Sequence, residues 1–147
     1  MKRIVKYEPR LERTGSLLVA DKSVNGPNDA VNVLRAFLPG PHVQESFVLL
    51  MLSSCNSITG IMEITRGTLN SSLVHPREVF APALQHRAAA IVVAHNHPSG
   101  NPEPSQDDIA VTKQLVDAGR VLGVPIHDHI VFTETGHTSF VERGLIS

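Results

Sequence analysis

The chain has 147 residues, enough for a single domain whose hydrophobic core is stable without disulfides. Hydrophobic residues make up 41% of it and charged residues 18%, a balance typical of a globular protein rather than a disordered or membrane-embedded one. The net charge of −1 and the aromatic content of 4% argue against direct binding to nucleic acid, which favours basic surfaces and aromatic stacking platforms.

We expect an N-terminal extension at residues 1–14, followed by one domain at residues 15–147. The start is basic but has neither the apolar segment nor the small-residue cleavage site of a secretory signal. Because no apolar run reaches the roughly 18 residues that span a bilayer, we expect a cytoplasmic protein without a membrane segment. The single cysteine, Cys55, excludes an intrachain disulfide and a cysteine-rich zinc site, and is expected to be a buried or loop thiol.

The first half of the chain predicts three strands and one helix. The segment SLLVA (16–20) has the pattern of a short strand, and GPNDAVNVLRAFLPG (26–40) that of a helix, with Pro27 in its first turn and Pro39-Gly40 at its end. The helix has an apolar face formed by Val31, Leu34, Phe37 and Leu38. The apolar run ESFVLLMLSS (45–54) predicts a central strand covered on both faces, joined through SCNS to a partner strand, SITGIMEITRG (57–67).

The second half alternates helices and strands. HPREVFAPALQHRAA (75–89) is expected to be helical, with Pro76 and Glu78 in the first turn and a kink or break at Pro82. AIVVA (90–94) predicts a second buried strand and SQDDIAVTKQLVDAGRVLG (105–123) a helix. The apolar face of that helix is expected at Ile109, Thr112, Val116 and Gly119. VPIHDHIVFT (124–133) predicts a third long strand that ends in the turn TETG, so the chain is expected to form a mixed α/β layered fold.

Two histidines stand where the second buried strand ends. Residues i and i+2 of a strand share a face, so His95 and His97 present neighbouring imidazoles, a spacing that suits two ligands of one metal. Pro98 ends the strand, and the following loop returns at the next helix, whose first turn carries Asp108. Asp108 would complete a His-His-Asp site. Ser105 with Asp108 is also a capping box, and a helix N-terminus is compatible with both interpretations.

Three protein ligands with an open position for water are typical of a catalytic zinc site, where the metal lowers the pKa of the water. A hydrolase also needs a carboxylate that accepts a proton from the water. Glu45, at the edge of the strand at 46–52, would serve, although a carboxylate there is also ordinary at a strand edge. A second pair, His127 and His129, is expected to share a face with Asp128 pointing away, but has no nearby third ligand.

The segment HNHPSGNPEPSQDD resembles the JAMM (MPN-plus) metalloprotease motif, in which His-x-His-Pro precedes six residues and then Ser-x-x-Asp. The matching positions are His95, His97, Pro98, Ser105 and Asp108. Three parts of the chain look like the RadC family, a bacterial branch of the JAB/MPN fold: RGTLNSSLVHPREVF, AAAIVVAHNHPSGNPEPS, and DHIVF with SFVERGLI. This resemblance covers about residues 15–147, nearly the whole chain.

The resemblance implies a single-domain, cytidine-deaminase-like α/β fold with a mixed, curved sheet flanked by helices. It implies zinc (Zn2+) held by His95, His97 and Asp108 with water as the fourth ligand. Glu45 matches the glutamate that acts as general acid and base, and Ser105 the serine that hydrogen-bonds the tetrahedral intermediate or the water. The implied reaction is hydrolysis of a peptide or isopeptide bond in a peptide or protein substrate, and the implied assembly is a homodimer.

The chain also departs from the family. Longer RadC proteins carry a helix-hairpin-helix region, and nothing in residues 1–40 resembles it; His127 stands where the family usually has an apolar residue, whereas Asp128-His129 matches. His129 is expected either to support the metal site or to be packed in the core. Two other functions remain open: a DNA-repair-associated or interaction protein with a vestigial metal site, and a metal-dependent nuclease. The metallo-β-lactamase pattern HxHxDH does not fit, because Pro98-Ser99-Gly100 follows the second histidine.

Overall fold

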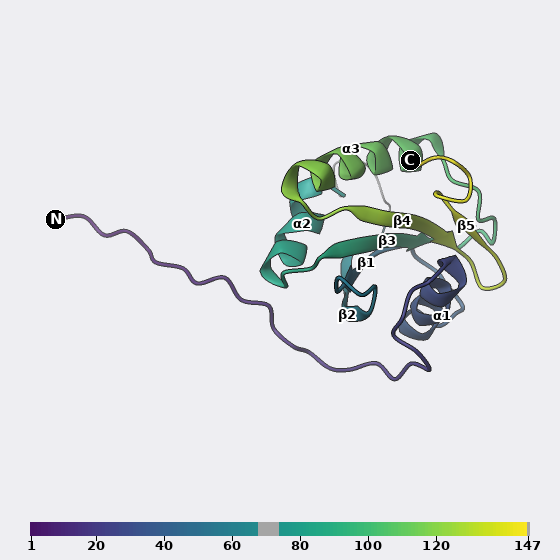
Figure 1. Cartoon of the computed structure of the whole chain (residues 1–147), viewed down its shortest axis with the longest axis horizontal. Coiled ribbons are helices and arrows are strands. Elements are labelled where there is room, and N and C mark those ends of the chain that lie inside the picture. Colours follow the sequence, from purple (N-terminus) through teal and green to yellow (C-terminus); the bar gives the residue numbers. More distant parts are fainter. Residues whose placement is uncertain (68–73, 147) are drawn as a thin grey trace.

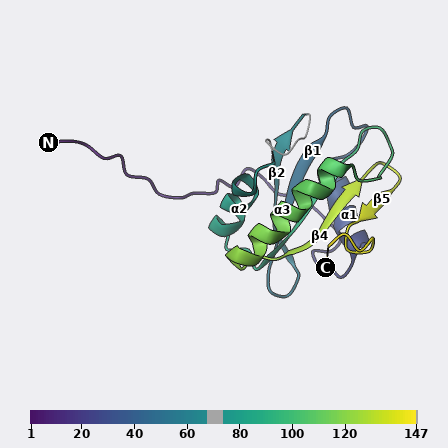
Figure 2. The ribbon, with the colours of Figure 1, turned by 90° about the horizontal axis from the view of Figure 1, so that it is seen from above.

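The computed structural model describes residues 1–67 and 74–146. It has a five-stranded open sheet in the order β2-β1-β3-β4-β5, with α1 on one face and α2 and α3 on the other (Figure 1). Seen from above, α3 lies along the face of the sheet (Figure 2). The helices are α1 (Pro27–Phe37), α2 (Pro76–Gln85) and α3 (Gln106–Leu122), and the strands are β1 (Ser46–Leu52), β2 (Ile58–Arg66), β3 (Ala90–Asn96), β4 (Ile126–Phe132) and β5 (His137–Ser139).

The centre of the sheet is formed by β1 and β3, whose residues are all buried. β1 pairs antiparallel with β2 and with β3, whereas β3 pairs parallel with β4, so the sheet is mixed. Continuous apolar runs on these strands are explained by burial of both faces. The predicted α/β fold, with a mixed sheet between helices, is therefore confirmed.

Each face of the sheet has its own hydrophobic core, because alternate strand residues point to opposite sides. On the side of α2 and α3, Phe47, Leu49 and Val93 pack with Phe80 and Leu115. On the side of α1, the core is formed by residues of α1, β1, β3 and β4: Val31, Leu34, Val48, Leu50, Val92, Ala94, Ile130 and Phe132. The side of α2 and α3 is also the side on which β1 and β3 bring polar groups together.

The start of the chain corrects one prediction. Residues 16–20 form no strand: Leu17 and Val19 pack on the α1-side core, but Leu18 is fully exposed. The start of β2 is instead approached by the next segment, where Val24 N–H donates to Asn56 O. Residues 1–16 are exposed and run away from the domain (Figure 1). Among the described residues, none of the helices is long and apolar enough to cross a membrane.

Two helices also differ in detail from the prediction. We expected a kink or a break at Pro82, and the structure shows no break, because α2 continues through this residue. The missing proline N–H affects one helix bond, and Pro82 is buried with Val79, Phe80 and Ala83. In α3, Thr112 and Gly119 are buried as expected, but Ile109 and Val116 are only partly buried. The buried apolar positions are Val111 and Leu115, so the helix turns a different face toward the sheet from the one expected.

Cys55 is an exposed thiol in the β1–β2 turn.

Gly119 allows α3 to approach the strand that follows it. A Cβ atom at Gly119 would lie 2.5 Å from the Val124 carbonyl oxygen, a backbone atom that has little freedom to move. We expect Gly119→Ala to lower the free energy of unfolding by about 1–3 kcal/mol, the usual cost of overpacking, in a urea titration. Gly136→Ala is the matched control, because its Cβ would make ordinary contacts of 3.6 Å. An unchanged midpoint for Gly119→Ala would contradict the close approach.

Candidate metal centre

The two central strands deliver the first ligands. Phe47 of β1 pairs with His95 of β3, and β3 extends to Asn96, two residues beyond the predicted strand. Asn96 joins the two strands at this edge: its Oδ1 accepts from Ser46 N–H at 2.6 Å and its Nδ2 donates to Gln44 O at 2.9 Å. Sequence reasoning missed this role, since the partner of Asn96 depends on the pairing of distant strands.

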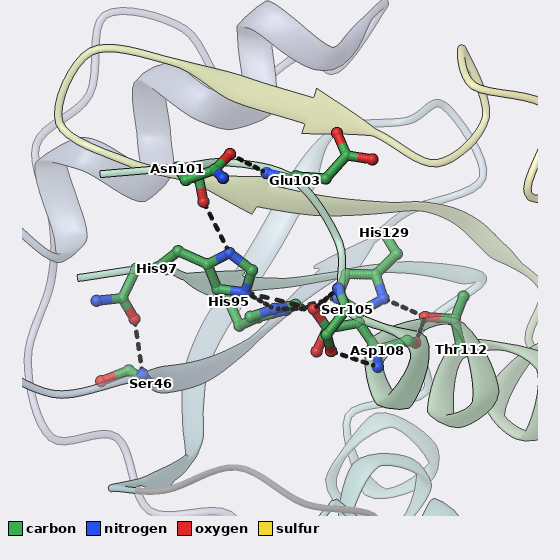
Figure 3. A network of polar contacts seen from close by, with 10 residues as sticks. Ser46, His95, His97, Asn101, Glu103, Ser105, Asp108, Thr112 and His129 are labelled. Atoms are coloured by element: carbon green, nitrogen blue, oxygen red, sulfur yellow. Dashed lines mark hydrogen bonds and ion pairs between the residues drawn. The ribbon is translucent and has the colours of Figure 1, made fainter. Parts of the chain in front are cut away.

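Three side chains meet at the end of β3 and the start of α3 (Figure 3). His95 Nε2 lies 3.0 Å from His97 Nε2, and each of these nitrogens lies 3.3 Å from Asp108 Oδ2. In the part of the chain that the structure describes, these residues are the group that could hold a metal ion. Ligand atoms around a tetrahedral zinc ion with bonds of about 2.0–2.1 Å stand roughly 3.3 Å apart. The donor set therefore fits such an ion with one ligand position left open.

The same contacts set the charges of these groups. Burial raises the pKa of Asp108, but the contacts of its carboxylate with the His95 and His97 rings outweigh it and hold the pKa far below its ordinary value. The neighbouring Asp108 carboxylate raises the pKa of His97, against the effect of burial. Asp108 is thus a carboxylate at neutral pH, as a metal ligand must be.

Asp108 is fixed by the helix that carries it. Ser105 is the N-cap of α3: its Oγ accepts from Asp108 N–H at 3.0 Å, and Asp108 Oδ2 accepts from Ser105 N–H at 2.8 Å. The capping box and the metal-site interpretation therefore hold together, because the cap aims the carboxylate at the histidines. The helix N-terminus also favours a negative charge at this place.

The loop between the histidines and α3 contacts the ring nitrogen of His97 that does not face the cluster. Asn101 O lies 3.0 Å from His97 Nδ1, and Asn101 Oδ1 accepts from Glu103 N–H at 3.1 Å (Figure 3). Glu103 in turn receives two bonds from Arg143, at 2.8 and 3.1 Å. Since Asn101 O can only accept, Nδ1 of His97 carries a proton, and in the neutral ring Nε2 faces the site as a lone pair.

Glu45 immediately precedes β1 and is partly buried. The antiparallel register that pairs Phe47 with His95, continued by two residues, places Glu45 opposite His97. The charge of Glu45 contributes to the raised pKa of His97, so the two groups are close enough to interact. The predicted general base thus lies beside the predicted ligands, and its role stays a prediction.

The second histidine pair does not form. His127 is exposed and His129 is buried, because the register of β3 and β4 shifts between Ile91 and Val92, which pair with Ile126 and Asp128. The expectation that His127 and His129 share a face is therefore wrong: His127 is the extra residue at this shift, and strand alternation restarts after it. His129 instead lies behind His95, with 2.8 Å between His129 Nε2 and His95 Nδ1.

Asp128 connects the start of β4 to the end of β5 and to the segment that follows it. Its carboxylate accepts from Ser139 Oγ at 2.6 Å, from His129 N–H at 2.8 Å and from Val141 N–H at 3.1 Å, and burial raises its pKa. Asp128→Ala leaves these donors without that acceptor. We expect it to lower the free energy of unfolding by about 2–3 kcal/mol in a urea titration.

The control for Asp128→Ala is Asp117→Ala, at a side chain that is 64% exposed. We expect that control to change the free energy of unfolding by less than about 0.5 kcal/mol. Equal midpoints for the two variants would contradict the structural role of Asp128.

A small pocket adjoins the three clustered side chains. Its walls combine apolar residues with the acidic start of α3 and two of the buried histidines: Phe47, Val74, Val111, Asp107, Asp108, His95 and His129. A group entering there meets an apolar wall on the side of β1 and a carboxylate on the side of α3.

Comparison with known proteins agrees with this architecture. The family model described as RadC-like JAB domain matches residues 24–145. A UPF0758 protein of Salinibacter ruber is 48% identical over 103 residues, which are 70% of this chain and 44% of that protein. One from Caldanaerobacter subterraneus is 43% identical over 122 residues, 83% of this chain and 52% of that protein.

The chain thus spans about half the length of the curated relatives it matches. Residues 68–73, inside one of the segments that carry the resemblance, lie outside the described residues. The family match covers all the strands, all the helices and the clustered side chains. The chain belongs to the RadC-like JAB domain family.

Proposed function

We propose that this domain is a zinc-dependent hydrolase of the JAMM type that cleaves a peptide or isopeptide bond. The observation that supports it best is the convergence of His95 Nε2, His97 Nε2 and Asp108 Oδ2 at mutual distances of 3.0–3.3 Å. A two-nitrogen, one-oxygen set with an open position is the donor pattern of catalytic zinc. Glu45, opposite His97 by register, adds the carboxylate that hydrolysis needs.

The residues around the proposed metal site have separate roles in the proposed reaction. A zinc ion held by His95, His97 and Asp108 would supply Lewis-acid chemistry and would lower the pKa of a water molecule there toward neutrality. Glu45 accepts a proton from the attacking water and returns it to the nitrogen that leaves as the carbon–nitrogen bond breaks. Ser105 Oγ accepts from Asp108 N–H through a lone pair, so its hydroxyl proton is left for the oxyanion that develops on the substrate carbonyl.

The substrate class is part of the proposal. The pocket wall of Phe47, Val74 and Val111 suits an apolar side chain or an extended peptide segment. The net charge of −1 gives no attraction for a polyphosphate backbone, which favours a peptide over a nucleic acid. Peptide or protein substrates, the homodimer and the cytoplasmic location all stay predictions.

Two measurements test the proposal in sequence. Elemental mass spectrometry on protein purified without added metal should find near one zinc per chain, and much less in His97→Ala. A library of peptides and lysine-linked isopeptides should then be cleaved by the wild type and not by Glu45→Gln. Zinc at full occupancy without cleavage of any library member would favour a vestigial site. Absence of zinc from the folded wild type would contradict the hydrolase.

A further inference from the structure

The buried side chain of His129 has no part in the proposed reaction, although it lies directly behind a proposed ligand. His129 Nε2 stands 2.8 Å from His95 Nδ1, and His129 Nδ1 stands 2.5 Å from Thr112 Oγ1. Thr112 Oγ1 donates at 2.7 Å to the backbone carbonyl of Asp108, one helical turn earlier. A chain of hydrogen bonds therefore runs from the backbone of one proposed ligand to the ring of another (Figure 3).

The direction of this chain follows from the number of protons available. The Asp108 carbonyl can only accept, so the single Thr112 hydroxyl proton points to it and Thr112 Oγ1 accepts from His129. His129 thus carries a proton on Nδ1. The His129 ring is buried, which favours its neutral form, so its Nε2 is an acceptor. The donor to it is His95 Nδ1–H, which leaves His95 Nε2 as a lone pair aimed at His97 and Asp108.

Neighbouring aromatic rings hold the two imidazoles in place. Phe140 stacks on His129 with 4.5 Å between ring centroids and 13° between planes. Phe47 lies nearly parallel to His95 at 6.2 Å and edge-on to His129 at 5.7 Å. His95 and His129 are each 1% exposed, so bulk water does not compete for Nδ1 of either ring.

We infer that Thr112 and His129 are positioning residues: together they hold His95 in the tautomer whose Nε2 is free to bind a metal ion. The inference rests on the metal site of the proposed function and adds the device that prepares it. It connects the orientation of His95 to the N-terminal part of α3, which also supplies Asp108. Hydrogen-bonded partners of this kind commonly account for 10–100-fold in metal affinity.

Two variants distinguish the effect of the Thr112 hydroxyl from the effect of the side chain's shape. Thr112→Val keeps the branched side chain and removes the hydroxyl that accepts from His129 Nδ1–H, whereas Thr112→Ser keeps the hydroxyl and removes a methyl group. We expect Thr112→Val to weaken zinc binding roughly 10–100-fold in a competition titration with a chromophoric chelator. Thr112→Ser should keep nearly the wild-type affinity, because it keeps the hydroxyl that accepts from His129 Nδ1–H. Urea titrations of both variants confirm that each is folded.

A second readout reports the tautomer without any metal. In metal-free protein with 15N-labelled histidine, NMR should show His95 protonated on Nδ1 and not on Nε2 in the wild type and Thr112→Ser. Thr112→Val should shift this pattern. A wild-type His95 protonated on Nε2, or a Thr112→Val variant with wild-type tautomer and zinc affinity, would overturn the inference. If the wild type binds zinc but cleaves nothing, only the proposed function fails. If it binds no zinc, the tautomer of His95 in the wild type and in Thr112→Val still tests the inference.

Discussion

Glu45→Gln is expected to lower the rate of hydrolysis at least about 100-fold while leaving the zinc content unchanged. Glutamine has nearly the shape of glutamate, but its amide does not accept the proton of the attacking water, and general-base catalysis is typically worth 10²–10⁴-fold. Glu45 lies opposite His97 by register and is not among the clustered ligand atoms. The measurement is an initial rate on a peptide or isopeptide found by library screening, with zinc determined on the same sample.

The control for this variant is Glu63→Gln on β2. The Glu63 carboxylate pairs with Arg66 at 3.0 Å, outside the cluster of ligand atoms. Glu63→Gln removes the same charge from the neighbouring strand and should retain the wild-type rate within about twofold, as expected of a group without a role in proton transfer. A Glu45→Gln variant that hydrolyses substrate as fast as Glu63→Gln would remove Glu45 from the mechanism. A variant that loses zinc would make Glu45 a determinant of binding instead.

His97→Ala is expected to weaken zinc binding by more than about 100-fold, beyond the 10–100-fold typical of residues that act through a ligand. It removes one of three ligand atoms and also the ring that contacts Asn101 O at 3.0 Å. The dissociation constant is measured by competition with a chelator at a fixed pH, since protons compete for the same groups.

His86→Ala is the matched control, because His86 contacts Thr59 Oγ1 at 2.9 Å outside the cluster. Its zinc affinity should equal that of the wild type. Similar affinities for His97→Ala and His86→Ala would mean that zinc binds elsewhere in the protein.

The local parts of the site were predictable from the sequence. His95 and His97 followed from the two-residue period of a strand, and Asp108 from the capping box with Ser105, which the structure contains with both of its bonds. These features depend on a few neighbouring residues. The central strands were predictable for a similar reason, because burial on both faces leaves a continuous apolar run.

The parts that depend on pairing between distant segments were not predictable. The shift of register at His127 separates it from His129, and it is set by how β4 aligns with β3. The polar contacts of Asn96 need the end of β1 beside the end of β3. The missing strand at residues 16–20 is a related case, since a short apolar run forms a strand only where a sheet edge accepts it.

Anomalous diffraction at the zinc absorption edge, from crystals of the zinc-loaded protein, tests the metal centre most directly. We expect one strong peak about 2.0–2.2 Å from His95 Nε2, His97 Nε2 and an Asp108 carboxylate oxygen, with room for one further ligand. A peak at other residues, or no peak beside these three in a protein shown to be loaded, would contradict the assignment of this edge of the sheet as a metal centre.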